Sequence, residues 1–185
     1  DESLISKALR KLADAKRRQG MPDAAERLFY ESQAISEKLG DVVGIAQTHK
    51  GLGYVYWRMG DYDRAREHYN QCISRVLASG DMHTAGIAYC ELGNVHSNSG
   101  DVEKAIEYYD MALTILSKFD DLSEMARVYN NLGDAHMNKN DWAGAISNLE
   151  KCMEISGKTN NRNYMAWSLF NAAECYANSG NPDKA

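Results

Sequence analysis

The sequence predicts an all-α protein: a right-handed superhelical solenoid of antiparallel helix pairs, with about nine helices. A residue suited to ending a helix stands at every twentieth position from Gly20 to Gly180. Two prolines in 185 residues argue against a loop-rich or all-β chain, whose turns recruit proline. With 44% hydrophobic and 25% charged residues, the chain has the composition of a folded protein.

Each turn combines a helix stop with a helix start. Gly, Asn and Asp can adopt the left-handed conformation that ends a helix. An Asp or Asn at the next position can accept hydrogen bonds from the free N–H groups of the following helix. The turns are Gly20-Met21, Gly40-Asp41, Gly60-Asp61, Gly80-Asp81, Gly100-Asp101, Asp120-Asp121, Asn140-Asp141, Asn160-Asn161 and Gly180-Asn181. We expect helices of about 17 residues between them, or roughly 26 Å each.

Alternate turns differ, so the true period is 40 residues. An alanine follows every second turn by five residues: Ala25, Ala65, Ala105, Ala145 and Ala185. A small residue follows the intervening turns by six: Ala46, Gly86, Ala126 and Ala166. Pro22 and Pro182 occupy equivalent first-turn places, where proline loses no helical hydrogen bond. Small residues at fixed places predict that neighbouring helices approach closely.

The period divides the chain into full repeats and a partial one, which together form a single solenoid over residues 1–185. The repeats are 1–40, 41–80, 81–120, 121–160 and a truncated fifth, 161–185. The last residues begin a helix, whereas repeat arrays usually end in a polar capping helix. We therefore expect the chain to be a fragment of a longer protein.

Equivalent side chains recur from repeat to repeat. The first repeat is the weakest, with Leu12-Ala13, Ala25, Phe29 and Ser32. The second reads Leu52-Gly53, Tyr56, Gly60-Asp61-Tyr62, Ala65, Tyr69 and Cys72. The third reads Tyr89, Leu92-Gly93, His96, Gly100-Asp101, Ala105, Tyr109 and Ala112. The fourth reads Tyr129, Leu132-Gly133, His136, Asp141-Trp142, Ala145, Leu149 and Cys152.

This pattern resembles the tetratricopeptide repeat (TPR) family, whose units run aromatic, Leu-Gly, aromatic, then Ala and a large residue in the second helix. The resemblance covers the whole chain. The unit is 40 residues here and lacks the closing proline, whereas the common TPR unit has about 34. It is similar to the long-repeat variety of the Pins/LGN-type polarity adaptors and of prokaryotic TPR arrays.

The resemblance implies a concave groove that is lined by the first helix of each pair and binds a peptide or a helix of a partner. Carried onto this sequence, it implies a groove lined by Lys7, Arg10, Asp14, Arg17, Gln47, Lys50, Tyr54, Trp57, Arg58, Ile87, Glu91, Asn94, Asn98, Arg127, Asn130, Asn131, Asp134, Asn138, Trp167, Phe170, Asn171, Glu174 and Asn178. Asparagine can bind a peptide backbone, arginine a carboxylate, and the aromatic rings supply apolar anchors. The alternative for the polar members is a solvated helix surface.

Charge is uneven along the chain, although its net value is −5. Residues 1–80 carry 13 basic and 11 acidic side chains, a net charge of +2. Residues 81–120 carry 2 basic and 7 acidic side chains, a net charge of −5. We expect an acidic segment of the partner at the N-terminal end of the groove; the alternative is a solvated basic helix face.

The chaperone-binding TPR domains hold a C-terminal carboxylate with a Lys–Asn–Asn–Lys–Arg set spread over three repeats. Lys50 occupies a suitable place here, but Tyr54 and Glu91 stand where the two asparagines belong. One repeat earlier, Arg10 is followed by Asp14, which would repel a carboxylate. We therefore do not expect binding of chaperone tails.

No catalytic, cofactor or metal site is predicted. His96 and His136 share a repeat position with Tyr56 and Tyr176, which indicates a packing place for a large ring; His49, His68 and His83 show no ligand spacing. The four cysteines show no C-x-x-C spacing and are expected to be reduced. Cys72, Cys152 and Cys175 look like small buried fillers, whereas Cys90 lies nearer the inner face and is the likeliest reactive thiol. Reduced cysteines favour a cytoplasmic protein.

We thus predict a non-catalytic scaffold for protein–protein interaction, without a cofactor. The acidic net charge disfavours nucleic acid as a partner, and no apolar run is long enough for a membrane span. One alternative is a ligand-responsive sensor region of a larger signalling or transcription protein. Another is self-association through the open repeat ends, and the sequence leaves the oligomeric state open.

Overall fold

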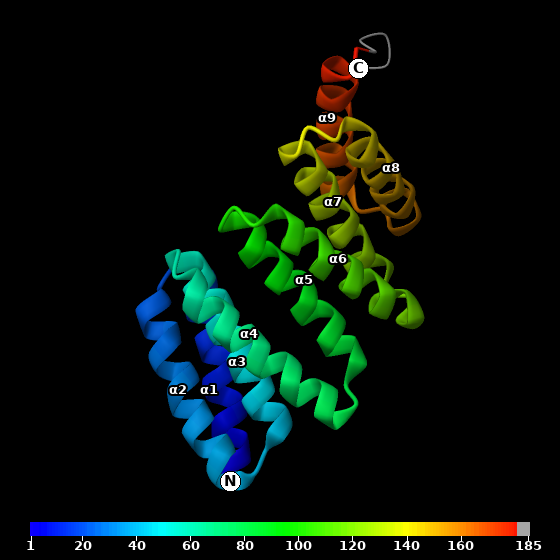
Figure 1. Cartoon of the computed structure of the whole chain (residues 1–185). Helices are drawn as coiled ribbons and strands as arrows, with labels where there is room; N and C mark the ends of the chain where they lie inside the picture. The colour runs from blue at the N-terminus through cyan, green and yellow to red at the C-terminus, as the bar shows by residue number, and fades with distance from the viewer. Residues whose placement is uncertain (181–185) are drawn as a thin grey trace. The chain divides into compact units, whose positions relative to one another are not determined.

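The computed structural model describes residues 1–180 of the 185, and all of its regular elements are helices (Figure 1). They are α1 (Glu2–Arg18), α2 (Pro22–Leu39), α3 (Val42–Met59), α4 (Tyr62–Ser79), α5 (Met82–Asn98), α6 (Val102–Leu116), the 3-10 segment η1 (Ser117–Phe119), α7 (Leu122–Asn138), α8 (Trp142–Thr159) and α9 (Arg162–Asn178). This confirms the predicted all-α fold class. The helix expected from Asn181, with Pro182 and Ala185, lies outside the described residues.

The predicted turn residues end the helices as expected. All nine, including Asp120, Asn140 and Asn160, have a positive φ between 50° and 87°. At the end of α2, the Gly40 N–H donates to the Glu37 carbonyl at 3.1 Å and the Asp41 N–H donates to the Ser36 carbonyl at 2.8 Å. This paired arrangement satisfies carbonyl groups that a helix end would otherwise leave without donors.

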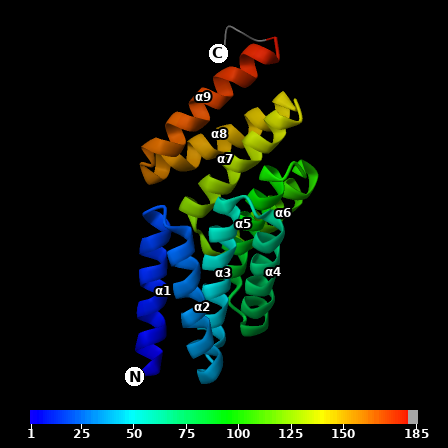
Figure 2. The same cartoon turned by 90° about the vertical axis from the view of Figure 1, so that its left-hand side faces the viewer.

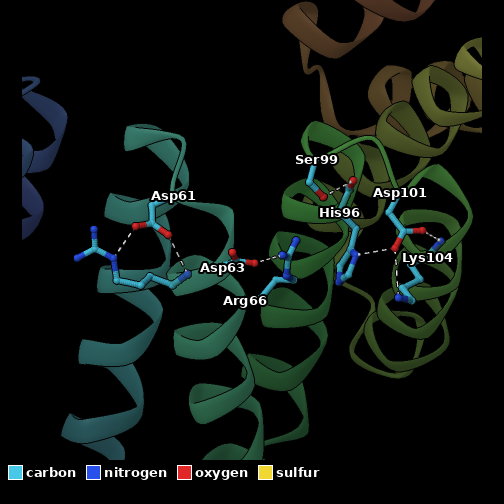
Figure 3. A network of polar contacts seen from close by, with 8 residues as sticks. Asp61, Asp63, Arg66, His96, Ser99, Asp101 and Lys104 are labelled. Atoms are coloured by element: carbon cyan, nitrogen blue, oxygen red, sulfur yellow. Dashed lines mark hydrogen bonds and ion pairs between the residues drawn. The ribbon is translucent and has the colours of Figure 1, made fainter.

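From Asp41 to Asn161, the residue after the turn caps the next helix. Figure 3 shows Asp61 and Asp101 in this role: their carboxylates accept from the backbone N–H groups of Arg64 at 3.1 Å and Lys104 at 3.4 Å. Met21 has no capping oxygen, and Pro22 at the first position of α2 has no N–H to satisfy. Helix α6 is shorter than expected because its last turn tightens into η1.

The contacts divide the chain inside α5 into two compact units, residues 1–95 and 96–185. In the first unit, α1 packs on α2 and α3, α2 on α3, and α3 on α4; Figures 1 and 2 show these four helices side by side. The first helices of the first two repeats, α1 and α3, are therefore in direct contact.

Small residues bring the helices of this unit together. A Cβ added at Gly51 would lie 2.3 Å from Cζ of Phe29, so the buried Phe29 ring rests directly on the backbone of α3. A Cβ at Gly53 would lie 2.9 Å from Cε2 of Tyr69. Ala25 and Ala65 are fully buried. The predicted close approach of helices at small residues is confirmed here.

In the second unit α7 packs on α6, α8 and α9, and α8 packs on α9 (Figure 2). Its core includes Ala145, Leu149, Ala172 and Cys175. A Cβ added at Gly133 would lie 2.6 Å from Cδ2 of Leu149, which repeats the close approach of the first unit. Ala166, expected at a close-approach place, is exposed. Within residues 1–180 no helix combines the length and apolar character needed to cross a membrane.

Candidate functional site

A cavity of about 740 Å³ opens in the first unit. Its wall is formed mainly by α1 and α3, and it is lined by seven of the predicted groove residues from these helices: Lys7, Arg10, Asp14, Arg17, Gln47, Lys50 and Tyr54. Phe29 and Tyr69 reach it from α2 and α4, and Ile87 and Glu91 from α5. The cavity is thus where the first helices of three repeats and two core aromatic rings meet.

The cavity has a marked excess of positive charge. Five basic side chains line it, against two acidic ones, Asp14 and Glu91. Within residues 1–180, Lys7, Lys11 and Lys50 form no ion pair with a carboxylate. Three lysines that form no ion pair among the described residues therefore line one space, which raises its electrostatic potential.

Arg17 differs from these lysines because its charge is already partnered. Its Nη2 lies 3.1 Å from Oδ1 of Asp14, and its guanidinium carbon lies 4.1 Å from the centre of the Tyr54 ring. Arg17 of α1 thus contacts Tyr54 of α3. Tyr54 in turn packs edge-on against Trp57, with ring centres 5.3 Å apart.

Arg10 is placed differently from the exposed stripe that its spacing suggested. It lines the cavity but is only 7% exposed. Its Nη1 donates to Oγ of Ser6 at 2.9 Å, and Oγ atoms of Ser36 and Ser32 lie at 3.3 and 3.4 Å. The second helix of the same repeat thus covers Arg10 and fixes its charge beneath the cavity.

The remaining predicted residues of α3 and α5 do not line this cavity. Trp57 is half-buried, with a buried Nε1 that has no hydrogen-bond partner, and the guanidinium of the exposed Arg58 lies 6.0 Å from its ring. Asn94 donates to Oε2 of Glu91 at 3.3 Å. Asn98 is exposed in the second unit.

In the second unit the predicted residues gather on α7 and α9. Arg127 is committed to Glu124, with Nε and Nη2 at 2.8 and 2.6 Å from its Oε2. Asn131 is half-buried, and the outward members Asn138, Trp167, Phe170 and Glu174 are exposed. Asn130 is buried, unlike Phe170, which occupies the same repeat position and is 70% exposed. Repeat position alone therefore does not decide which of these side chains is reachable.

Asp134 is the polar centre of this second group. Asn171 Nδ2 donates to its Oδ1 at 2.6 Å, and Asn130 Nδ2 donates to its Oδ2 at 3.3 Å. Burial raises the pKa of Asp134 to about 6, against the opposing effect of the Asn171 hydrogen bond. The structure therefore joins three predicted residues from α7 and α9, of which Asp134 and Asn171 are 37 positions apart in the sequence.

Sequence reasoning missed a contact between His49 and His68, whose Nδ1 atoms lie 2.9 Å apart. Burial lowers the pKa of both rings, that of His49 to about 4. A signal was present, because the equivalent positions of the first repeat hold two apolar residues, Leu9 and Leu28. Paired substitutions at equivalent places indicate that the two positions are in contact.

The repeat position of Tyr56 and His96 packs rings as expected. Tyr56 stacks on His68 and His96 stacks on Tyr108, each with ring centres 5.2 Å apart. His136 Nδ1 lies 2.8 Å from Oδ2 of Asp141. In the described part of the chain no three His, Cys, Asp or Glu side chains gather as a metal site would require.

The four cysteines are free and buried. Cys90, expected to lie nearer the inner face and to be the likeliest reactive thiol, is fully buried. Burial raises the pKa of the Cys72 thiol to about 11, so this thiol is held in its protonated, unreactive form.

Comparisons with known proteins identify the repeat family and the fold. Family models described as tetratricopeptide repeat match residues 4–78 and 124–185, and residues 86–119. No curated protein matches the sequence.

Three solved structures illustrate the likeness of fold. BtubC from P. vanneervenii has 22% identity and a TM-score of 0.86, with 100% of this chain and 76% of that chain covered. Aspartyl phosphate phosphatase F from Bacillus subtilis has 16% identity and a TM-score of 0.90, with 94% and 45% covered. A signal transduction ATPase with a tetratricopeptide repeat sensor, from Pyrococcus horikoshii, has 19% identity and a TM-score of 0.86, with 96% and 28% covered.

Proposed function

Because the chain belongs to the tetratricopeptide repeat family, we propose that it is a non-catalytic protein-interaction module whose first unit binds a peptide or helix of a partner protein. The occupied site is the cavity between α1 and α3, and the bound segment is acidic. The observation that carries this proposal is the set of lysines, Lys7, Lys11 and Lys50, that line the cavity without a carboxylate partner among the described residues.

Charge and shape favour an acidic segment over a neutral one. Bringing like charges together costs free energy, and an anionic ligand relieves that cost while it gains Coulomb attraction. Arg10 adds a buried positive charge that cannot turn away into solvent, because serine hydroxyls hold its Nη1. Acidic side chains of a partner could therefore interact with the fixed charge of Arg10 and with the flexible lysine side chains.

An apolar floor supports binding beyond charge attraction. Apolar residues also line the cavity: Phe29 and Tyr69 are almost fully buried, whereas Ile87 is half-buried and Leu4 is 64% exposed. An apolar residue beside the acidic ones could pack against Leu4 and Ile87, and such buried anchors dominate interface energies. The proposed ligand is thus an acidic segment that also carries an apolar side chain.

The test starts from a random peptide library displayed on phage and selected on the full chain. We expect enrichment of peptides that contain acidic residues next to an apolar one. Fluorescence anisotropy should then show weaker binding at high salt, and about tenfold weaker binding by the double variant Lys7→Glu, Lys50→Glu. The matched control is Lys118→Glu, an exposed lysine on η1. Enrichment without acidic residues, or equal binding by the double variant, would refute the proposal.

A second candidate is a ligand-responsive sensor region of a larger signalling protein. It is supported by the structural likeness to the ATPase whose repeats are described as a sensor, of which this chain spans 28%. In that case a selected peptide should change the radius of gyration of the chain in small-angle scattering. An unchanged radius of gyration at saturating peptide would argue against the sensor and favour the simple binding module.

A further inference from the structure

We infer that the second unit carries a separate site, on the face shared by α7 and α9, for an organic cation with N–H donors, as on a lysine or arginine side chain. Its centre is the Asp134 carboxylate with Asn130 and Asn171 beside it. The inference does not depend on the cavity of the first unit, because none of these residues lines that cavity. It would let the chain bind a basic side chain at one place and an acidic segment at another.

The site has more acceptors than donors. An ionised carboxylate can accept about four hydrogen bonds, and among residues 1–180 two side-chain donors reach Asp134, from Asn171 at 2.6 Å and from Asn130 at 3.3 Å. Oδ1 of Asn130 is buried without any donor, and Asn130 is only 6% exposed. A buried acceptor without a donor is costly, so this face lacks N–H groups that a ligand could bring.

The charge of Asp134 is also uncompensated, as a comparison of repeats shows. At the same position of the first repeat, Asp14 is paired with Arg17 three residues later, at 3.1 Å. The residue three positions after Asp134 is Met137, and no ion pair to Asp134 occurs within residues 1–180. Arg127, the basic groove residue of this helix, is held by Glu124. The carboxylate is therefore partly buried without a cation of its own.

An exposed aromatic ring stands on the same face of α9 as Asn171, one of the two asparagines that donate to Asp134. Trp167 lies four residues before Asn171 on α9, so the two side chains share one face, and Trp167 is 60% exposed. Tryptophan is the best aromatic partner for a cation, and it also covers the methylene stem of lysine or arginine. A ligand that reaches both Asn171 and Trp167 needs a carbon stem as well as N–H donors, which an organic cation has and a bare inorganic ion lacks.

The ligand set argues against a metal ion at the same place. Calcium and magnesium take six or more oxygen ligands, several of them carboxylates. Asp134 is the one carboxylate at this centre, and the described residues hold no group of three acidic, His or Cys side chains suited to a metal. The asparagine amides point N–H donors at the carboxylate and so use part of its coordination capacity.

The test follows the side-chain amide signals of Asn130 and Asn171 by NMR in the full ¹⁵N-labelled chain near neutral pH. The probes are Nα-acetyl-lysine methylamide, the arginine analogue, the uncharged norleucine analogue, tetramethylammonium and Mg²⁺. We expect the lysine and arginine probes to shift both signals in a saturable way, and the norleucine probe to leave them in place. Tetramethylammonium, which has no N–H donor, should bind about tenfold more weakly than whichever of the lysine and arginine probes binds more tightly.

Two variants locate the effect. Asp134→Asn should weaken binding of the lysine and arginine probes about tenfold or more, and Trp167→Ala, an exposed change that spares the core, should weaken it several-fold. Asp110→Asn, at an exposed carboxylate of α6, is the matched control and should bind as the parent does. Equal shifts with norleucine, shifts with Mg²⁺ alone, or undiminished binding by both Asp134→Asn and Trp167→Ala would overturn the inference.

Discussion

The Nδ1 atoms of His49 and His68 lie 2.9 Å apart and join α3 to α4 through a single shared hydrogen bond. One ring must donate and the other accept, so the contact requires at least one neutral imidazole. His68 is also stacked on Tyr56, whose hydroxyl donates to Glu26 at 2.5 Å. Glu26, Tyr56 and the two histidines thus form a continuous set of contacts that links α2, α3 and α4.

This contact predicts a loss of stability in acid. The folded pKa of His49, about 4, lies below its ordinary value of 6.5, and that of His68 is lowered as well, mainly by burial. Unfolding therefore takes up protons between these values, so the stabilisation is present above about pH 6.5 and is lost as the pH falls towards 4. Arg75 and Arg64 add to the lowering, whereas Glu37, Glu67 and Glu26 oppose it.

The measurement is the free energy of unfolding by urea at several pH values. The double variant His49→Leu, His68→Leu copies the residues of the first repeat, and between pH 7 and pH 4.5 it should lose about 2 kcal/mol less than the parent. An identical pH slope in parent and variant would show that the pair does not control acid stability.

Asp134 predicts the opposite dependence on pH. Its folded pKa, about 6, lies above its ordinary value of 3.8, so the folded state holds the proton more tightly and stability falls as the pH rises from about 4 to about 6. Asp134→Asn removes this cost. We expect it to raise the free energy of unfolding by about 1 kcal/mol at pH 8 and to have little effect at pH 4. A variant that is less stable than the parent at pH 8 would contradict the uncompensated charge.

Gly133 should tolerate no side chain. A Cβ there would lie 2.6 Å from Cδ2 of Leu149, inside the core of the second unit. Gly133→Leu should therefore cost more than about 2 kcal/mol, because α7 and α8 would be forced apart. Gly157→Ala in α8 is the control. The nearest atom to its added Cβ is Cε of Met165 at 3.6 Å, an ordinary contact distance, and the change should stabilise the helix by about 0.5 kcal/mol. Equal melting temperatures for the two variants would contradict the close packing.

The helix caps predict unequal effects for two nearby aspartates. Asp61 accepts from the Arg64 backbone N–H at 3.1 Å, whereas Asp63 is exposed and pairs only with the side chain of Arg66 (Figure 3). Asp61→Ala should cost about 1 kcal/mol through the lost cap, and Asp63→Ala less than about 0.5 kcal/mol, as exposed ion pairs contribute little. Thermal unfolding of both variants compares them directly, and a larger cost for Asp63→Ala would be inconsistent with capping as the stabilising role.

The helix boundaries and the family were predictable from the sequence because they depend on local chemistry. A left-handed residue such as Asn140 and a capping Asp141 set a helix end within four residues of themselves, whatever the chain does elsewhere. The 40-residue period then placed Phe29, Tyr69 and the small residues in register, so the packed repeat and the TPR assignment followed.

The candidate sites were predictable only as stripes on single helices. Spacings of three and four place side chains on one face, but they do not say what the neighbouring helix does to that face. Ser32 and Ser36 of α2 bury Arg10, and Asn171 of α9 reaches Asp134 from a position 37 residues away. Burial and pairing are properties of packed helices rather than of local spacing. For that reason tertiary structure alone decided that Lys7 and Lys50 line one cavity without a carboxylate partner among residues 1–180, that Arg127 pairs with Glu124, and that His49 meets His68.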